Sequence, residues 1–324
     1  MKLNMVQALN RALAQEMERD PEVVILGEDV GIDGGVFRIT DGLIDRFGPE
    51  RVIDTPLAES AIVGAAVGMA AYGLKPIAEI QFMGFVYQAF HQILQHMARM
   101  RNRTRSRITQ PVVVRIPYGA GVRALELHSE STEALFCQLP GLYVVVPSTP
   151  RDALGLMTAA IRCEDPVIFL EPKRLYRAGK QEISEDPVDI PLSKAKVTRE
   201  GDDLTIVAWG AMVPVALAAA EDVEKSGIFP EIIDLRTLSP MDFATVQASV
   251  EKTGRALIVH EAPKTCGLGA EIAARIGEKS LLKLAAPVLR VTGQDITVPM
   301  AKNEDYYYPT PQRLVYSINK LMEW

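Results

Sequence analysis

The stretch DTPLAESAIVGAAVGMA, residues 54–70, decides the fold of this chain. In it a lone carboxylate, Glu59, is followed by residues that are almost all small or apolar. This pattern predicts a helix over residues 59–72 that begins at the carboxylate. Poor hydration favours the neutral form of a carboxylate, which suits it to sharing a proton with a weakly basic ring nitrogen. The alternative is an acidic residue that the helix dipole favours at a helix start.

Two glycines of this expected helix, Gly64 and Gly68, lie four residues apart and are flanked by alanines. Residues at this spacing share one face of a helix, and a face without bulky side chains lets another backbone approach closely. The alternative is ordinary tight packing inside one domain, which the spacing leaves open.

Outward from this helix, short β-branched runs alternate with helical stretches, a pattern that predicts a parallel sheet covered by helices on both faces. A polar stretch over residues 178–203 has the composition of an exposed connection. We therefore expect two doubly wound α/β domains, residues 1–190 and a smaller domain over residues 191–324. The expected strands lie at residues 23–26, 51–53, 77–80, 112–115, 144–146, 167–170, 204–208, 231–235 and 256–259, and the expected helices at 5–19, 59–72, 87–99, 151–161, 213–224, 242–250 and 270–276.

Composition excludes several classes of protein. The 324 residues carry 41 acidic and 35 basic side chains, a net charge of −6, and such a field disfavours binding to nucleic acid or an anionic membrane. The longest apolar run, residues 62–74, is shorter than the roughly 20 residues that span a bilayer. The amino terminus lacks the pattern of a signal peptide, so we expect a cytoplasmic location. The three cysteines have no metal-ligand or disulfide-framework spacing.

The helix at residues 59–72 also carries a recognisable motif. Glu59, Gly64, Ala65, Gly68 and Met69 match the pattern of the pyrimidine-binding domains of thiamine diphosphate enzymes. Further motifs extend the match over nearly the whole chain, and with them the sequence resembles the β subunit (E1β) of the E1 component of 2-oxo acid dehydrogenase complexes. These motifs are LGEDVG (26–31), GGVFR (34–38), DTPLAE (54–59), EIQF (79–82), HS (128–129), PGL (140–142) and DPVIFLEPKRLYR (165–177).

The resemblance implies a thiamine-diphosphate pyrimidine-binding domain followed by a transketolase C-terminal-like domain. It implies that Glu59 hydrogen-bonds N1′ of the aminopyrimidine and so promotes loss of the thiazolium C2 proton. His128 corresponds to a family histidine at the mouth of the active site, where it would hold a substrate carboxylate or assist acyl transfer. Phe85 falls where the family stacks an aromatic ring on the pyrimidine, although it would also suit a core. Glu28 and Leu57 belong to the same pocket.

The family also binds a potassium ion through backbone carbonyl oxygens, ligands that suit a hard cation. In this sequence, Cys163 occupies a position where the family usually has an aspartate, which weakens the match. The corresponding residues here are Val112, Ala160, Ile161, Cys163 and Asp165.

One motif of thiamine diphosphate enzymes is missing: no GDG is followed about 25 residues later by the Asn that would help to hold Mg²⁺ and the diphosphate. The resemblance therefore implies a site shared with an E1α subunit, which would hold Mg²⁺, in an α2β2 heterotetramer. The segment VHEAPKTCGLGAEIAARI, residues 259–276, resembles the C-terminal domain of transketolases. By resemblance this domain supports assembly and docks the lipoyl acyltransferase (E2).

The expected reaction is decarboxylation of a 2-oxo acid and reductive acylation of a lipoyl group on E2. GFVYQAF and ELHSES favour pyruvate, while a branched-chain 2-oxo acid or acetoin remains the alternative. A different class of function is a non-catalytic scaffold that docks E2, but such a scaffold needs neither Glu59 nor His128. An independent nucleotide-binding module has little support, because no GxGxxG or GxxxxGK[ST] follows a strand.

Two other features receive plain interpretations. The basic segment RMRNRTRSR, residues 99–107, is expected to form a subunit contact or a solvated face in this acidic chain. His91 and His96 are five residues apart, so we expect them on different helical faces and not as a metal-binding pair.

Overall fold

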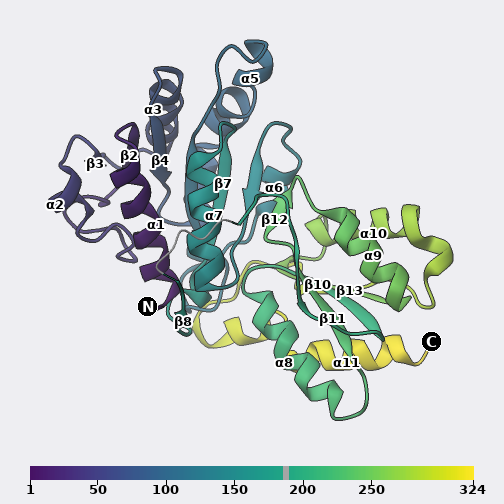
Figure 1. Cartoon of the computed structure of the whole chain (residues 1–324). Helices are drawn as coiled ribbons and strands as arrows, with labels where there is room; N and C mark the ends of the chain where they lie inside the picture. Colours follow the sequence, from purple (N-terminus) through teal and green to yellow (C-terminus); the bar gives the residue numbers. More distant parts are fainter. Residues whose placement is uncertain (185–189) are drawn as a thin grey trace.

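The computed structural model describes residues 1–184 and 190–324. Two α/β units, each built on its own sheet, make up most of the molecule (Figure 1). Residues 185–189, part of the expected connection, lie outside this description. The first sheet has seven strands in the order β12-β6-β7-β5-β4-β2-β3, all parallel except β12. Its strands are β2 (Val23–Gly27), β3 (Val52–Asp54), β4 (Lys75–Glu79), β5 (Val113–Tyr118), β6 (Tyr143–Val145), β7 (Val167–Pro172) and β12 (Thr237–Ser239).

Helices cover both faces of the first sheet. On one face, α1 (Met5–Arg19) and α7 (Pro150–Arg162) pack against each other and against β2, β5 and β7. On the other face lie α3 (Glu59–Ala71) and α6 (Glu133–Cys137). Each element of this group buries apolar side chains toward the strands, so the sheet is enclosed as parallel sheets usually are.

Local sequence signals explain where the covering helices begin. The side chain of Asn4 accepts from Gln7 N at 2.9 Å, and Gln7 Oε1 accepts from Asn4 N at 3.1 Å, which forms a capping box at the start of α1. Thr149 caps α7 in a similar way, with a proline at the first turn. The expected helix at residues 5–19 is confirmed.

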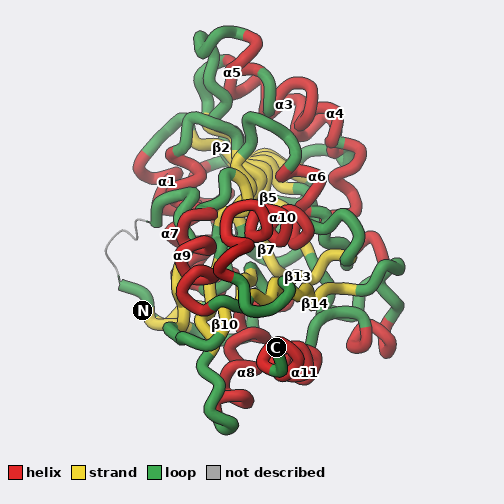
Figure 2. The backbone as a smooth tube through the Cα atoms, turned by 90° about the vertical axis from the view of Figure 1, so that its right-hand side faces the viewer, coloured by secondary structure: helices red, strands yellow, loops and turns green. Residues whose placement is uncertain are grey.

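The second sheet has five strands in the order β14-β13-β10-β11-β9, with only β9 antiparallel to its neighbour. Helices α8 and α11 cover one face, and α9 and α10 cover the other, as Figure 2 also shows from the side. The elements are β9 (Lys196–Arg199), β10 (Leu204–Ala208), β11 (Pro230–Asp234), β13 (Ala256–Pro263), β14 (Leu289–Gly293), α8 (Met212–Glu224), α9 (Phe243–Thr253), α10 (Leu268–Ser280) and α11 (Pro311–Met322).

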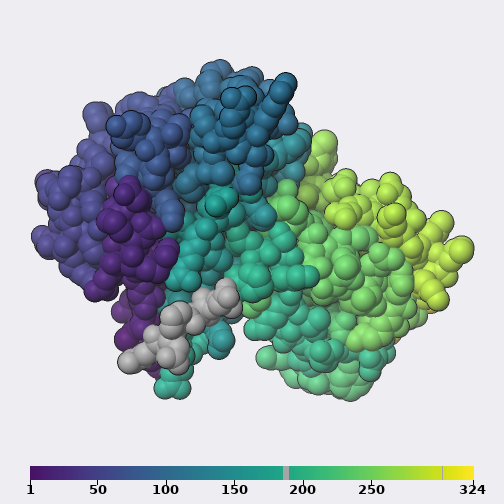
Figure 3. Space-filling view, turned by 45° about the horizontal axis from the view of Figure 1, so that its top comes forward, coloured from purple at the N-terminus to yellow at the C-terminus, as the bar shows by residue number. Residues whose placement is uncertain are grey.

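The two α/β units are joined through both side chains and backbone. Strand β12 comes from the second half of the chain but pairs antiparallel with β6 at the edge of the first sheet. One apolar cluster runs from α3 through the first sheet to α9 and α10. The space-filling view shows the two halves in contact along a broad boundary (Figure 3). A two-stranded ribbon, β1 (Lys2–Leu3) with β8 (Gln181–Glu182), lies at the amino terminus.

The expected single helix over residues 87–99 is wrong. The chain instead forms a 3₁₀ helix η1 (Met83–Gln88), a short α4 (Phe90–Gln92), a π-helical turn η2 (Ile93–Met97) and α5 (Met100–Arg103). The expectation that His91 and His96 lie on different helical faces is wrong, because the π turn brings their ring centroids to 5.6 Å from each other. Residues five apart share a face when the hydrogen bonds run from i to i+5.

Of the helices in residues 1–184 and 190–324, none combines the length and apolar character that crossing a membrane requires.

Candidate active site

The expected site residues follow the carboxyl ends of four neighbouring parallel strands, β5, β4, β2 and β3. Glu28 follows β2, Glu59 opens the helix after β3, Phe85 lies in η1 after β4, and His128 ends the segment after β5. Parallel strands end at the same edge of a sheet, and open α/β folds place their ligands there. The fold thus brings residues from across the first domain to one edge.

Glu59 is the first residue of α3 and is 5% exposed. Its Oε2 atom is buried and has no hydrogen-bond partner within the described chain. A buried carboxylate oxygen without a donor costs free energy unless a ligand, water or partner supplies one. This atom therefore fits a group that donates or shares a proton, as an aminopyrimidine nitrogen would.

Glu28 lies close enough to Glu59 for their charges to interact. Burial, followed by repulsion from Asp29 and Glu59, raises the pKa of the Glu28 carboxyl. The Glu28 loop is fixed by Asp54 at the end of β3, whose carboxylate accepts from Gly31 N at 2.6 Å. The Glu28 carboxyl therefore binds a proton more readily than a free glutamate does.

Three aromatic rings in the loops after β4 and β5, those of Phe82, Phe85 and His128, pack against one another and form an aromatic wall. The ring centroid of Phe82 lies 4.2 Å from that of His128, and the centroid of Phe85 lies 5.2 Å from the same ring. Gly84 permits this approach, because a Cβ there would lie 2.3 Å from the carbonyl oxygen of Leu127. Sequence reasoning quoted Phe82 in the EIQF motif but missed its contact with the histidine.

The polar atoms around His128 are also incompletely paired. Glu126 Oε2, His128 Nδ1 and Ser129 Oγ are buried without a hydrogen-bond partner in residues 1–184 and 190–324. In contrast, Leu57, two residues before the first residue of α3, is 69% exposed. An exposed apolar side chain and unpaired buried polar atoms after strands of the same sheet indicate a surface that is completed by another molecule.

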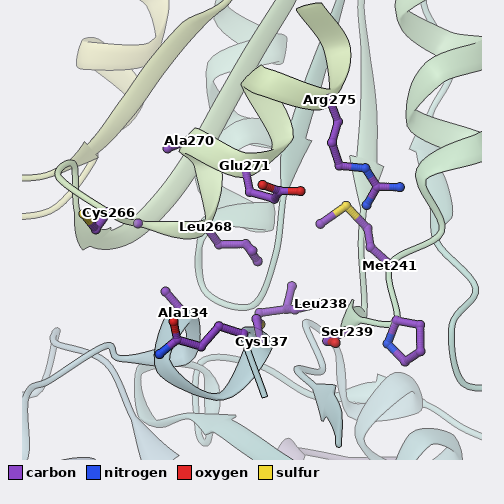
Figure 4. Close-up of a pocket in the computed structure, with 13 residues that line it drawn as sticks. Ala134, Cys137, Leu238, Ser239, Met241, Cys266, Leu268, Ala270, Glu271 and Arg275 are labelled. Carbon is purple, nitrogen blue, oxygen red and sulfur yellow. The ribbon is translucent and has the colours of Figure 1, made fainter. Parts of the chain in front are cut away.

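A well-formed cavity of this chain lies away from this edge. A cavity of about 610 Å³ lies between α6 and α10, and Figure 4 shows Glu271 and Arg275 of α10 facing Cys137 and Leu238 across it. Its lining includes neither Glu59 nor His128. A site that two chains share is open on each chain separately, so concavity in one chain is a poor guide to it.

A buried ionic group supports the strands beneath the candidate site. Arg115 of β5 pairs with Glu79 of β4 and makes hydrogen bonds of 2.8 and 2.7 Å with the Glu171 carboxylate of β7. Tyr176 donates to Glu171 at 2.6 Å. Burial raises the pKa of Glu79 to about 7, while the Arg115 charge opposes that shift. These contacts join three strands near the ends that carry the site.

The expected potassium residues lie at the other edge of the first domain, near the end of α7 and the starts of β5 and β7. The carbonyl oxygen of Val112 accepts from Val167 N at 2.9 Å, and that of Ala160 accepts from Cys163 N at 3.2 Å. Each oxygen has a second lone pair, so these bonds leave room for a cation.

The remaining members of that group are placed differently. Ile161 is buried, and the Asp165 carboxylate pairs with Arg101 at 2.7 Å. The nearby Gln110 is fully buried, yet both side-chain polar atoms lack a partner in the described residues. Among the described residues, no three His, Cys, Asp or Glu side chains are grouped as metal ligands. A site formed by backbone carbonyl oxygens does not require such side chains.

All three cysteines are free thiols in the described residues. Cys137 and Cys163 are half-buried and Cys266 is exposed. Burial raises the pKa of the Cys163 thiol.

Comparison with known proteins agrees with this geometry. The family model for the pyrimidine-binding domain of transketolase matches residues 1–179, and that for the transketolase C-terminal domain matches residues 193–314. The chain is 53% identical over 319 residues to a pyruvate dehydrogenase E1 component subunit beta of Acholeplasma laidlawii, covering 98% of each chain. The chain belongs to this E1β family. It is also 49% identical to the subunit of that name in Bacillus subtilis, over 100% of this chain and 99% of the relative.

A solved structure supports the fold assignment of this E1β chain. The structure described as "Split gene transketolase, inactive beta4 tetramer" aligns with a TM-score of 0.82 and 25% identity, covering 99% of this chain and 98% of that chain. The expected two-domain, doubly wound α/β fold and the resemblance to E1β are both confirmed.

Proposed function

We propose that this chain is the β half of a pyruvate dehydrogenase E1 that decarboxylates pyruvate and transfers the acetyl group to the lipoyl group of E2. The observation that carries the proposal is the buried, unpartnered Oε2 of Glu59 at the strand edge of a full-length E1β match. Thiamine diphosphate, when bound, supplies the electron sink for decarboxylation.

The residues of this chain would each handle one part of the chemistry. Glu59 would hydrogen-bond N1′ of the pyrimidine, and Glu28 would line the acidic region beside it. Leu57 and Phe85 flank the ring and exclude water from it. His128 packs against Phe82, and its buried Nδ1 has no partner in the described residues. Its ring would bind a substrate carboxylate or move a proton during acyl transfer.

The other half of the site would come from E1α in an α2β2 heterotetramer, with Mg²⁺ and the diphosphate held by that subunit. The small-residue face of α3 supports a contact of this kind. An added Cβ at Gly68 would meet no atom of the described chain within 4 Å, and Tyr72 at the end of the helix is 92% exposed. The tetramer of the related split transketolase, which contains β chains alone, is described as inactive.

Several further assignments belong to the same proposal. We propose a domain division near residue 190, with residues 1–190 binding the pyrimidine and residues 191–324 supporting assembly and E2 docking. A potassium ion at Val112, Ala160, Ile161, Cys163 and Asp165 is supported by the unpaired amide of Gln110. A cytoplasmic location completes the proposal.

The test is decarboxylation by this chain alone and after assembly with its E1α, with thiamine diphosphate and Mg²⁺. We expect activity only in the assembled enzyme, with pyruvate preferred over 3-methyl-2-oxobutanoate. Turnover by the β chain alone would contradict the shared site. Preference for the branched-chain acid would change the substrate, and inactivity of a correctly assembled tetramer would favour a scaffold.

A further inference from the structure

The segment that leads from β5 to His128 is held from outside its own domain. Ala120 N donates to the carboxylate of Glu261, which lies 141 residues away in β13. Gly121 N donates to Glu304 Oε1 at 2.6 Å, across 183 residues of sequence. Glu304 belongs to the 3₁₀ helix η6 (Ala301–Tyr306). Two carboxylates of the second domain thus bind the backbone that precedes the candidate catalytic histidine.

Glu304 uses both of its carboxylate oxygens on this segment. Oε2 accepts from Arg123 N at 2.6 Å, while Oε1 holds Gly121 N. Gly121 and Arg123 have left-handed backbone, with φ of 95° and 55°, a conformation in which nearby amides converge on one anion. Glu304 is buried, and a hydrogen bond away from water is electrostatically stronger than one in water.

A second set of buried charges fixes the start of the segment. Lys173 donates to the carbonyl oxygen of Gly119 and lies near the carboxylates of Glu261 and Glu304. Burial lowers the pKa of Lys173 to about 8, and the two carboxylates oppose that shift. Gly119 has φ of 86°, and a Cβ there would lie 2.9 Å from Glu261 Oε2. The backbone and the carboxylate are therefore fitted to each other.

The far end of the segment is fixed inside the first domain. Gly119 N donates to the carbonyl oxygen of Glu130 at 2.8 Å, which closes the loop that contains His128. Leu127, the residue before His128, meets Gly84 as described above. The orientation of the imidazole ring against Phe82 therefore depends on both domains.

We propose that Glu304, assisted by Glu261, is a positioning residue that fixes the backbone turn at residues 120–123 and so orients His128. The inference rests on the proposed role of His128. It gives the second domain a part in catalysis as well as in assembly. Glu304 does not touch the substrate in this scheme, and its effect reaches the reaction only through the histidine loop.

The test uses the assembled enzyme with Glu304→Gln. This substitution keeps the size of the side chain but replaces one accepting oxygen by an NH2 group, which cannot accept a hydrogen bond from a backbone amide. We expect faster amide exchange at Gly121 and Arg123 and a kcat reduced by about 10- to 100-fold, since small misplacements of catalytic groups have effects of that size. The midpoint of thermal unfolding should fall by a few degrees, because one buried amide is left without an acceptor. The matched control is Asp305→Asn, which removes the exposed 3.0 Å ion pair with the Arg123 guanidinium and leaves an amide oxygen to accept the 3.0 Å hydrogen bond from the Tyr308 hydroxyl.

A double variant separates this inference from the role of His128. If Glu304 acts through the histidine, His128→Ala/Glu304→Gln should have the same kcat as His128→Ala. If the double variant instead lost kcat by the product of the two single-variant reductions, the positioning role would be overturned. Unchanged amide exchange in Glu304→Gln would also overturn it. Full activity of His128→Ala would instead overturn the proposed role of His128. If Glu304→Gln fails to assemble, Glu304→Asp, which keeps the charge and shortens the reach, takes its place in the same comparisons.

Discussion

The two domains use the carboxyl ends of their parallel strands in opposite ways. In the first sheet these ends carry Glu59 and His128, whose buried polar atoms lack partners in the described chain. In the second sheet they carry Asp234 at the end of β11 and Glu261 near the end of β13, and both accept hydrogen bonds from the first domain. Trp209, directly after β10, donates to Glu133 at 3.2 Å.

The difference shows that two sheets of the same architecture can serve different purposes at the carboxyl ends of their strands. Both sheets present polar groups where open α/β folds bind ligands. The second edge is filled by the first domain and works as a support, whereas the first edge stays incomplete on this chain. The hydrogen bonds that the first domain donates to Asp234 and Glu261, and not the fold, distinguish the support from the candidate site.

The largest expected effect follows from changing the first edge alone. Glu59→Gln keeps the volume of the side chain but cannot share the proton, so kcat of the assembled enzyme should fall by about 10²- to 10⁴-fold. The matched change at the second edge, Asp234→Asn, should leave kcat within about threefold. Steady-state decarboxylation rates check both, and equal losses would remove the distinction between the two edges.

The support beneath the first edge should dominate stability. Arg115→Met leaves Glu79 and Glu171 buried without their cation, which should cost about 3–5 kcal/mol in the free energy of unfolding. Urea denaturation of the β chain measures this cost. Arg46→Met removes an exposed 3.5 Å pair with Glu18 and should cost less than about 1 kcal/mol. Similar midpoints for the two variants would show that the buried group contributes little.

The buried His260 at the second edge should make the free energy of unfolding depend on pH. Burial lowers the pKa of His260 from 6.5 to about 4, and its ring stacks on Trp209 at 5.4 Å. As pH falls, the unfolded chain binds a proton at His260 before the folded chain does. The contribution of neutral His260 to the free energy of unfolding is therefore fully present above pH 6.5 and is lost as pH falls toward 4. The loss attributable to His260 should reach about 2 kcal/mol at pH 5.

The comparison that isolates this effect uses His260→Gln. Unfolding free energies of both proteins at pH 7 and pH 5 are needed, because buried acids such as Asp234, whose pKa burial raises to about 7, shift stability in the opposite direction. The fall between pH 7 and pH 5 should be smaller in the variant. An identical fall in both proteins would contradict a buried neutral imidazole.

The smallest effect concerns the aromatic wall of the first edge. Phe85→Leu should weaken thiamine diphosphate binding by about 3- to 10-fold, since an aromatic contact is worth about 0.5–1.5 kcal/mol beyond its buried area. Phe82→Leu, which loses the 4.2 Å contact with His128, should lower kcat more than cofactor affinity. Titration of the assembled enzyme with cofactor separates the two. The reverse pattern would exchange the roles of the two rings.

The sequence predicted those elements whose signal is local. Helix α1 and strand β10 have the expected bounds because amphipathic spacing, a cap or a β-branched run defines each of them. Strand β12 was missed because three residues carry little periodicity and its partner, β6, is far away in sequence. Helix α11 was also missed, although its buried face and Thr310 cap provided a signal.

The candidate site was predictable where the family motif includes the side chain, as for Glu59 and His128. Phe82 stands in a quoted motif, but its contact with His128 depends on two loops that follow different strands. Glu304 was not predictable from the sequence, because nothing near η6 identifies the amides of Gly121 and Arg123 as its partners. Side chains that act through distant backbone groups require the folded structure.

The most direct test of the first edge as the reactive one is deuterium exchange at C2 of thiamine diphosphate, followed by NMR after acid quench in the assembled enzyme. Exchange should be fast with the natural β chain, remain fast with Asp234→Asn, and slow by at least about 100-fold with Glu59→Gln. Rapid exchange in the fully assembled Glu59→Gln enzyme would contradict the account, because proton transfer would then proceed without the carboxylate on which the proposed site is built.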